Sequence, residues 1–207
     1  MDGQKRKAIL QLVMIGIAVV AVVGLSIDYV LSNKHQEDLN STFSSLVDPF
    51  FPDDGGITME TAITITEPTS DAWQAVCFHN LYDEDLVASG DGGEKTGDFN
   101  YDLLSQGHQA KSPEEADFLI SYFYKYKNIG TYNDGSKARR AYTCVYVYRV
   151  KDGVYDRIAE NVFVGEGDPP EVISGSGWTS DKPDKGSIAQ WIEDKITKYN
   201  QKLKEAS

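Results

Sequence analysis

The stretch AYTCVYVYRVKDGVYDRIAENVFV, residues 141–164, decides the fold of this chain. It contains two runs rich in β-branched and aromatic residues, which are typical of strands. Between them stands Lys151-Asp152-Gly153, and an Asp-Gly pair supplies the positive φ angles of a type I′ turn. The sequence therefore predicts a tight antiparallel hairpin of strands 141–150 and 154–164.

The turn also predicts which residues of the two strands lie opposite each other. The expected pairs are Arg149 with Asp156, Tyr148 with Arg157, and Val147 with Ile158. Alternation then places Val145, Val147 and Ile158 on one face, which we predict to be the core face. The other face receives Tyr142, Tyr146, Tyr148, Tyr155 and Arg157.

Further elements are expected on both sides of the hairpin. A strand at 117–126 follows a helical turn at 112–115, and earlier strands are predicted at 57–66 and 73–80. Residues 81–111 lose periodicity and predict a loop with a short helix near Tyr101. The segment 165–186 is rich in Gly, Ser and Pro and is also predicted to be a loop.

The chain is expected to end in an amphipathic helix capped by Ser187. Its apolar stripe comprises Ile188, Trp191, Ile192, Ile196, Tyr199 and Leu203. Such a stripe packs across a sheet. The predicted fold class is α+β: a mainly antiparallel sheet of four or five strands, packed by this C-terminal helix and preceded by an N-terminal transmembrane helix.

Residues 8–27 form an apolar run of 20 residues without charge, directly after Lys5, Arg6 and Lys7. A helix of this length spans a hydrocarbon core of about 30 Å, and the basic cluster places the N-terminus in the cytoplasm. The predicted organisation is a cytoplasmic tail (1–7), a transmembrane helix (8–27), a stalk (28–56) and an extracytoplasmic domain (57–207). A cleaved secretory signal is the alternative, although its apolar region is usually only about 7–15 residues long.

The charge balance of 20 Lys+Arg against 32 Asp+Glu bears on the partners of the chain. Binding to nucleic acid requires clustered basic residues that displace counterions from phosphates. We therefore expect no nucleic-acid partner and an integral location in the cell membrane, with another envelope protein or cell-wall glycan as the ligand. No motif predicts a cofactor.

The two cysteines, Cys77 and Cys144, have no spacing typical of a zinc site. Outside the membrane they could form a disulfide closing a loop of 67 residues. Alternatively, both are small buried residues of neighbouring strands.

Few residues suggest catalysis or metal binding. Cys77 and His79 are expected on the same face of one strand, and a thiolate-imidazole pair with the carboxylates of Asp83, Glu84 and Asp85 would suit a hydrolase or a metal-dependent enzyme. The spacing matches no calcium loop or zinc set, so we predict no metal site. Packing and solvated loop charges are the alternative roles. A second acidic, glycine-rich run contains Asp91, Glu94, Asp98 and Asp102 and is expected to be a flexible loop.

Tyrosine enrichment of the central strands is the main candidate for ligand binding. Aromatic rings with a polar edge stack on sugars or contact partner proteins. The candidate residues are Tyr122, Tyr124, Tyr142, Tyr146, Tyr148 and Arg157, with Tyr126 beside them. The alternative is that the stalk or the C-terminal helix covers these rings.

Two short segments, LLSQG at 103–107 and EEADFLISY at 114–122, resemble the helix-to-strand passage of small bacterial envelope lipoprotein domains. That group is similar in layout to lipoproteins that bind or activate cell-wall synthases. The resemblance implies an α+β envelope domain and carries over no functional residue. The chain departs from the group because it has no lipid-acceptor cysteine after its apolar segment.

The sequence thus favours a membrane-anchored, non-catalytic binding or accessory module of the cell envelope. Two alternatives remain at this point: an envelope hydrolase or metal-dependent enzyme using Cys77 and His79, and a structural subunit recognised through its transmembrane helix.

Overall fold

The computed structural model describes residues 29–46, 65–70, 72–80, 97–171 and 177–206. The chain divides into two units, residues 1–41 and 42–207. An α-helix covers 29–43, within the predicted stalk, and a 3-10 turn follows at Ser44–Leu46. The predicted membrane span at 8–27 lies outside the described residues, and none of the described helices is long and apolar enough to cross a bilayer.

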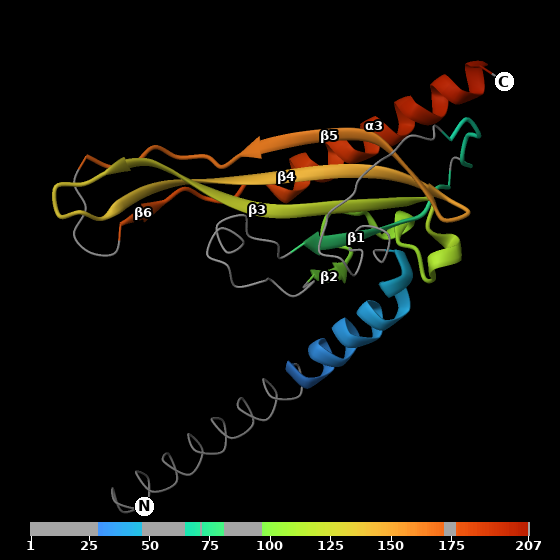
Figure 1. Ribbon diagram of the computed structural model, residues 1–207, viewed down its shortest axis with the longest axis horizontal. Coiled ribbons are helices and arrows are strands. Elements are labelled where there is room, and N and C mark those ends of the chain that lie inside the picture. Colours follow the sequence, from blue (N-terminus) through green and yellow to red (C-terminus); the bar gives the residue numbers. More distant parts are fainter. Residues whose placement is uncertain (1–28, 47–64, 71, 81–96, 172–176, 207) are drawn as a thin grey trace, which may run out of the picture. The chain divides into compact units, whose positions relative to one another are not determined.

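The second unit is an α+β fold built on a six-stranded mixed sheet (Figure 1). The strands are β1 (Ala75–Asn80), β2 (Gly97–Asn100), β3 (Phe118–Thr131), β4 (Lys137–Lys151), β5 (Val154–Val164) and β6 (Trp178–Thr179). Their order is β2-β1-β3-β4-β5, and β6 pairs with β4. β1 with β3 and β4 with β6 are parallel, whereas the other pairs are antiparallel.

Two of these strands differ from the expectation of four or five strands. β2 lies in the predicted loop 81–111, and β6 lies in the predicted loop 165–186. Both are short, and neither has the alternating pattern by which a strand is recognised in sequence. They are formed by hydrogen bonding to a neighbouring strand, which local propensity does not reveal.

The β4–β5 hairpin forms around the predicted turn, with Asp152 at φ 51° and Gly153 at φ 76°. The expected pairs of Arg149 with Asp156 and of Tyr148 with Arg157 are confirmed. Beyond them the register shifts, and Val147 pairs with Ala159 rather than with Ile158. The cause is a β-bulge at Ile158, an extra residue that leaves both Ile158 and Ala159 against the core.

The hairpin of β3 and β4 extends well beyond the rest of the sheet (Figure 1). The strand predicted at 117–126 therefore ends too early, and the strand predicted at 141–150 begins too late. Residues 125–131 are all exposed, and none of the described helices packs against the strand there. Because neither face of the strand is buried there, its residues need not alternate between apolar and polar, and the sequence gives no pattern by which to recognise the strand.

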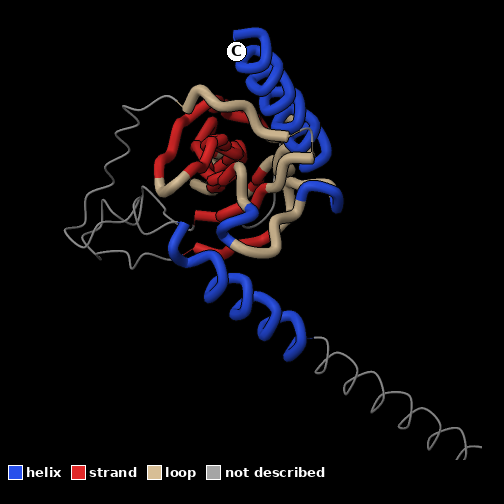
Figure 2. Tube along the Cα trace, turned by 90° about the vertical axis from the view of Figure 1, so that its right-hand side faces the viewer, coloured by secondary structure: helices blue, strands red, loops and turns tan. Residues whose placement is uncertain are grey.

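Helix α3 (Lys185–Ala206) packs on one face of the sheet, as Figure 2 shows. Its buried Ile188, Ile192 and Ile196 belong to the same hydrophobic cluster as the predicted core residues Val145 and Val147. From the sheet, the core also includes Ala75, Cys77, Phe118, Ile120 and Tyr122. The predicted packing of the C-terminal helix across the sheet is confirmed.

The helix begins with an aspartate cap rather than the predicted Ser187. The Asp184 carboxylate accepts hydrogen bonds from the Ser187 backbone N–H at 2.7 Å and from its hydroxyl at 2.9 Å. These bonds lower the pKa of Asp184. Ser187 thus lies inside the first turn and donates to the residue that caps it.

Residues 65–70 form an irregular strap over the C-terminal half of α3. The Ile65 backbone N–H donates to the Asp156 carboxylate at 3.1 Å, and Tyr199 donates its hydroxyl to the Ile65 carbonyl at 2.7 Å. Asn200 of α3 bonds both the backbone and the side chain of Thr69. Ile65 and Thr66 are therefore not in a strand, contrary to the prediction for 57–66, whose remainder lies outside the described residues.

Two short helical predictions fall between β2 and β3. The 3-10 turn at Pro113–Glu115 confirms the turn expected at 112–115. The helix expected near Tyr101 is not formed; a hydrogen-bonded turn closes there instead, followed by a 3-10 turn at Gln106–His108.

Candidate functional site

The candidate nucleophile Cys77 lies in the core beneath α3. It is completely buried in β1, and this burial raises the pKa of its thiol to about 12. Because the thiolate is the reactive form of cysteine, the protonated and sealed thiol is unsuited to nucleophilic attack.

His79 lies on the same face of β1 but is half-buried between two tyrosines. Its ring stacks on Tyr122 with centroids 4.9 Å apart and meets the edge of Tyr124 at 5.0 Å. Burial lowers the pKa of His79, and the nearby Asp98 carboxylate opposes that shift. The arrangement holds the imidazole neutral as a packing element.

The carboxylates expected beside Cys77 and His79 lie outside the described residues, namely Asp83, Glu84 and Asp85. Asp91 and Glu94 of the second acidic run also lie outside them. Asp98 is described on β2, and Asp102 pairs with Lys185 of α3 at 2.5 Å. Among the described residues, no group of three His, Cys, Asp or Glu side chains could hold a metal ion.

Cys77 and Cys144 are both buried, and neither is in a disulfide. Cys77 lies beside Ile120 on the α3 face, whereas Cys144 lies beside Phe123 on the opposite face. The intervening sheet separates the two thiols, so the candidate disulfide is not formed.

The six tyrosines predicted to gather around one surface are divided between two faces of the sheet. Residues directly opposite each other share a face, and Tyr122 and Tyr124 lie opposite Val145 and Thr143 on the α3 side. Tyr122 is buried, and burial raises the pKa of its hydroxyl, which donates to Asn100 at 3.4 Å.

Tyr124 and Tyr126 occupy more open positions on the same side. The Lys182 ammonium lies 3.8 Å from the ring centroid of Tyr124, a cation–π contact. Tyr126 is 42% exposed on the extended hairpin. These two tyrosines are therefore separated from Tyr142, Tyr146 and Tyr148 by the thickness of the sheet.

The face opposite α3, hereafter the open face, contains Tyr142, Tyr146, Tyr148 and Arg157. In Figure 1, α3 passes behind β5, so this face is turned toward the viewer. Tyr148 is fully buried, whereas Tyr142 and Tyr146 are partly exposed and Arg157 is exposed. Four of the six predicted ligand-binding residues thus share this face of the sheet, and three of them, Tyr142, Tyr146 and Arg157, are accessible to solvent.

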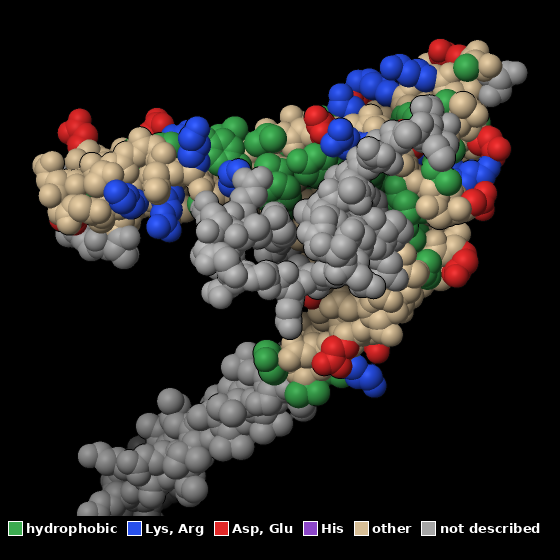
Figure 3. Space-filling model, in the orientation of Figure 1, with side chains coloured by type: hydrophobic (Ala, Val, Ile, Leu, Met, Phe, Trp, Pro, Cys, Tyr) green, Lys and Arg blue, Asp and Glu red, His purple; other side chains and the backbone are tan. Residues whose placement is uncertain are grey.

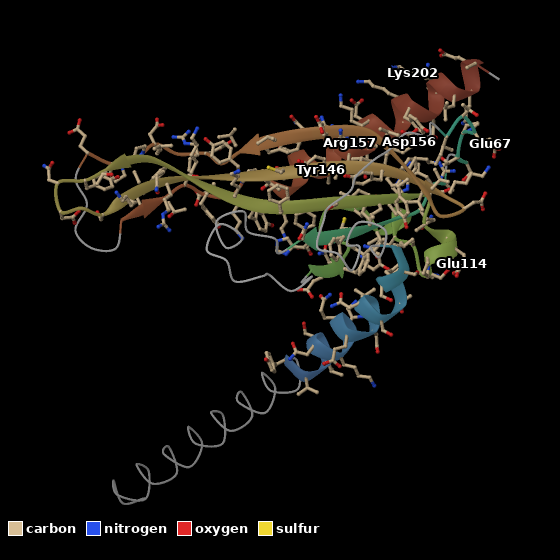
Figure 4. All side chains as sticks on the ribbon, viewed as in Figure 1. Glu67, Glu114, Tyr146, Asp156, Arg157 and Lys202 are labelled. Atoms are coloured by element: carbon tan, nitrogen blue, oxygen red, sulfur yellow. The ribbon has the colours of Figure 1, made fainter. Side chains whose placement is uncertain are left out.

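Tyr146 is at the centre of an aromatic row on the open face. Its ring stacks at 6.3 Å from that of Phe123 and at 6.5 Å from that of Tyr148. The Arg157 guanidinium lies 5.9 Å from the Tyr146 centroid and pairs with Glu160 at 3.2 Å. Figure 4 shows Tyr146 and Arg157 on neighbouring strands.

Phe123, Val162 and Val164 also belong to the open face but were not among the predicted ligand-binding residues. Val162 is 54% exposed and Val164 49% exposed. In Figure 3, hydrophobic side chains gather over the middle of β4 and the C-terminal part of β5. Extending the hairpin register into β3 would have revealed Phe123, because it lies opposite Cys144.

A separate cavity of about 540 Å³ opens at the end of the sheet, lined in part by Arg149, Asp117 and Glu114. The Arg149 Nη1 donates to the carbonyls of Asp117 at 2.8 Å and Val150 at 2.6 Å. Its Nε is buried and has no hydrogen-bond partner among the described residues. Since these bonds join the start of β3 to the end of β4, Arg149 acts as a structural clamp.

Comparisons with known proteins add no family to this geometry. The chain matches no family model, no curated protein and no solved structure.

Proposed function

We propose that the protein is a membrane-anchored, extracytoplasmic binding module without catalytic activity, and that it contacts a partner protein of the cell envelope through the open face. The anchor and its orientation rest on the sequence of residues 5–27. The binding role rests on the aromatic row centred on Tyr146.

The composition of the open face supports a protein partner. Tyrosine and arginine are enriched where binding energy concentrates in protein interfaces, and the buried core of an interface is more apolar than its rim. Phe123, Tyr146 and Arg157 lie together with the exposed Val162 and Val164. Cell-wall glycan is the other ligand expected from the sequence, since tyrosine rings also stack on sugars.

The hydrolase alternative has less support. Its nucleophile would be Cys77, whose thiol is sealed and protonated. A structural subunit recognised through residues 8–27 is a distinct proposal, for which replacing that segment with an unrelated apolar helix is the test. If the replacement abolishes partner recovery while the open face is intact, recognition lies in the segment.

The binding proposal is tested by crosslinking in native membranes followed by mass spectrometry of the partners. Tyr146→Ala and Arg157→Ala should each reduce partner recovery by roughly tenfold or more, because truncated interface anchors cost about 2 kcal/mol. Tyr126→Ala is the matched control, an exposed tyrosine on the other side of the sheet. Equal recovery from all three variants would refute binding through the open face.

Two further measurements separate the parts of the proposal. Binding of the purified chain to cell-wall glycan fragments, lost with Tyr146→Ala, would replace the protein ligand with a glycan. A C-terminal reporter should be degraded by protease added to intact cells. A protected reporter would show that the domain lies inside and would refute the extracytoplasmic assignment.

A further inference from the structure

The outer edge of β5 has a row of backbone groups that no strand in the described part of the chain pairs. β5 is the last strand in the sheet order, and residues 159–164 form backbone hydrogen bonds with β4 alone among the elements that the structure describes. Unpaired N–H and C=O groups of an edge strand are a template for another strand. A partner that binds this edge through backbone hydrogen bonds is therefore an extended polypeptide.

The strap at 65–70 contacts the first half of β5 and the turn before it. Ile65 of the strap bonds Asp156, and Glu67 pairs with Lys151 just before β5. In Figure 1, α3 emerges beside this N-terminal half. The bulge at Ile158 interrupts the regular ladder, so a regular edge begins at Ala159.

The second half of β5 lacks the usual devices that prevent edge pairing. Residues 159–164, AENVFV, contain no proline and no lysine. The single charge, Glu160, is paired with Arg157 at 3.2 Å. Val162 and Val164 present about half of their surfaces to solvent.

We infer that this edge pairs with the same edge of a second copy of the chain, antiparallel and two-fold symmetric about Val162. In this register Val162 lies opposite Val162 of the second copy, and Glu160 lies opposite Val164. Directly paired residues then share a face, as the pleat requires. The exposed valines become mutual neighbours, and no like charges are opposed.

Charge opposes pairing with a second copy less at this position than over most of the surface. The chain carries a net charge of −12, so two copies repel each other over most of their surfaces. Repulsion is small at 159–164 because the Glu160 carboxylate is already paired with Arg157. The proposal concerns the edge of β5 and does not depend on the function proposed for the open face.

Disulfide trapping of the full-length chain in detergent tests the register. The parent for the trap carries Cys144→Ala, because Cys144 lies opposite Val162 within one chain. Directly opposed residues have Cα atoms about 4.5–5.5 Å apart, which a disulfide spans. Val162→Cys in this parent should form a disulfide-linked dimer under mild oxidation. Gln190→Cys, on the exposed side of α3, should form no more dimer than the parent does.

A mixing experiment checks the register independently. Glu160→Cys and Val164→Cys chains should crosslink to each other more than either does to itself. Sedimentation of the otherwise native chain should show that Val162→Lys weakens the dimer by about tenfold or more, whereas Val162→Thr weakens it less. Circular dichroism of each variant separates loss of pairing from loss of folding.

Three outcomes would overturn the inference. The first is a folded chain with both Cys144→Ala and Val162→Cys that stays monomeric under oxidation. The second is equal crosslinking of Val162→Cys and Gln190→Cys. The third is a crosslink from Val162→Cys, in membranes, to a different polypeptide instead of a second copy.

Discussion

Cys144 on β4 and Val162 on β5 lie directly opposite each other on the open face of the sheet. This relationship follows from the β-bulge at Ile158, which shifts the register of the hairpin beyond Tyr148. Without the bulge, Cys144 would lie opposite Asn161. The bulge thus determines which side chain of β5 is the neighbour of the buried thiol.

The pairing predicts an intrachain disulfide in the single variant Val162→Cys. Directly opposed residues have the Cα separation that a disulfide requires. On oxidation, the thiols of Cys144 and of the new cysteine at position 162 should both be lost. The mobility of the monomer on a non-reducing gel should change, and no dimer should form. Val164→Cys, opposite Tyr142, is the matched control and should form no such bond. An oxidised Val164→Cys with a reduced Val162→Cys would contradict the register.

Arg149→Met should destabilise the fold by about 2–4 kcal/mol, because it removes a buried group that bonds two backbone carbonyls. Arg149 is 6% exposed and also lies over the Phe118 ring, 5.4 Å from its centroid. Urea denaturation measures the change. Arg140→Met is the control, since its partner Asp168 is exposed, and it should cost less than about 1 kcal/mol. Similar losses for both variants would reject the clamp role.

Asn200→Ala should cost about 1–3 kcal/mol, since it leaves the Thr69 backbone N–H without its acceptor in a buried position. The strap at 65–70 should then be cleaved faster by protease than in the parent. Gln201→Ala, one position along the same helix and exposed, should change neither quantity appreciably. The prediction fails if the two variants melt at the same temperature.

Alkaline pH should destabilise the protein through Cys77. Burial raises the pKa of this thiol from 9.0 to about 12, so the folded chain retains a proton that the unfolded chain loses. The stabilising contribution is complete below pH 9 and decreases as pH rises from 9 toward 12. Burial also raises the pKa of Tyr199 to about 12, so part of the slope remains without Cys77.

The measurement is the free energy of unfolding between pH 8 and 11 for the parent and for Cys77→Ala. The variant should show a shallower decrease with pH, whatever its stability at pH 8. A thiol reagent should label Cys77 only when the chain unfolds. Parallel slopes for parent and variant would show that Cys77 ionises equally in both states.

Acidic pH should destabilise the protein through His79. Burial lowers the pKa of His79 below its ordinary value of 6.5, so the unfolded chain binds a proton that the folded chain rejects. The stabilising contribution is complete above pH 6.5 and decreases as pH falls below it. His79→Phe retains a ring between Tyr122 and Tyr124 and should reduce this acid sensitivity. His35→Phe is the matched control, and an equal effect of both substitutions would contradict the prediction.

The sequence by itself determined the elements that local chemistry specifies. The Asp152-Gly153 turn and the runs beside it predicted the β4–β5 hairpin and its first pairs. The apolar stripe from Ile188 to Tyr199 predicted the C-terminal helix and its packing. In both cases the signal lies within the element itself: the Asp-Gly pair forms the turn of the hairpin, and the spacing of the apolar residues forms the buried side of the helix.

Only the tertiary structure decided how the candidate site residues are distributed. The sequence placed Tyr122 and Tyr146 together because both alternate within tyrosine-rich strands, but the side of the sheet occupied by each depends on the pairing of β3 with β4. Likewise, the burial of Cys77 beneath α3 depends on contacts between residues more than 100 positions apart. Strand register and long-range packing involve two segments at once, so the pattern of either segment alone does not contain them.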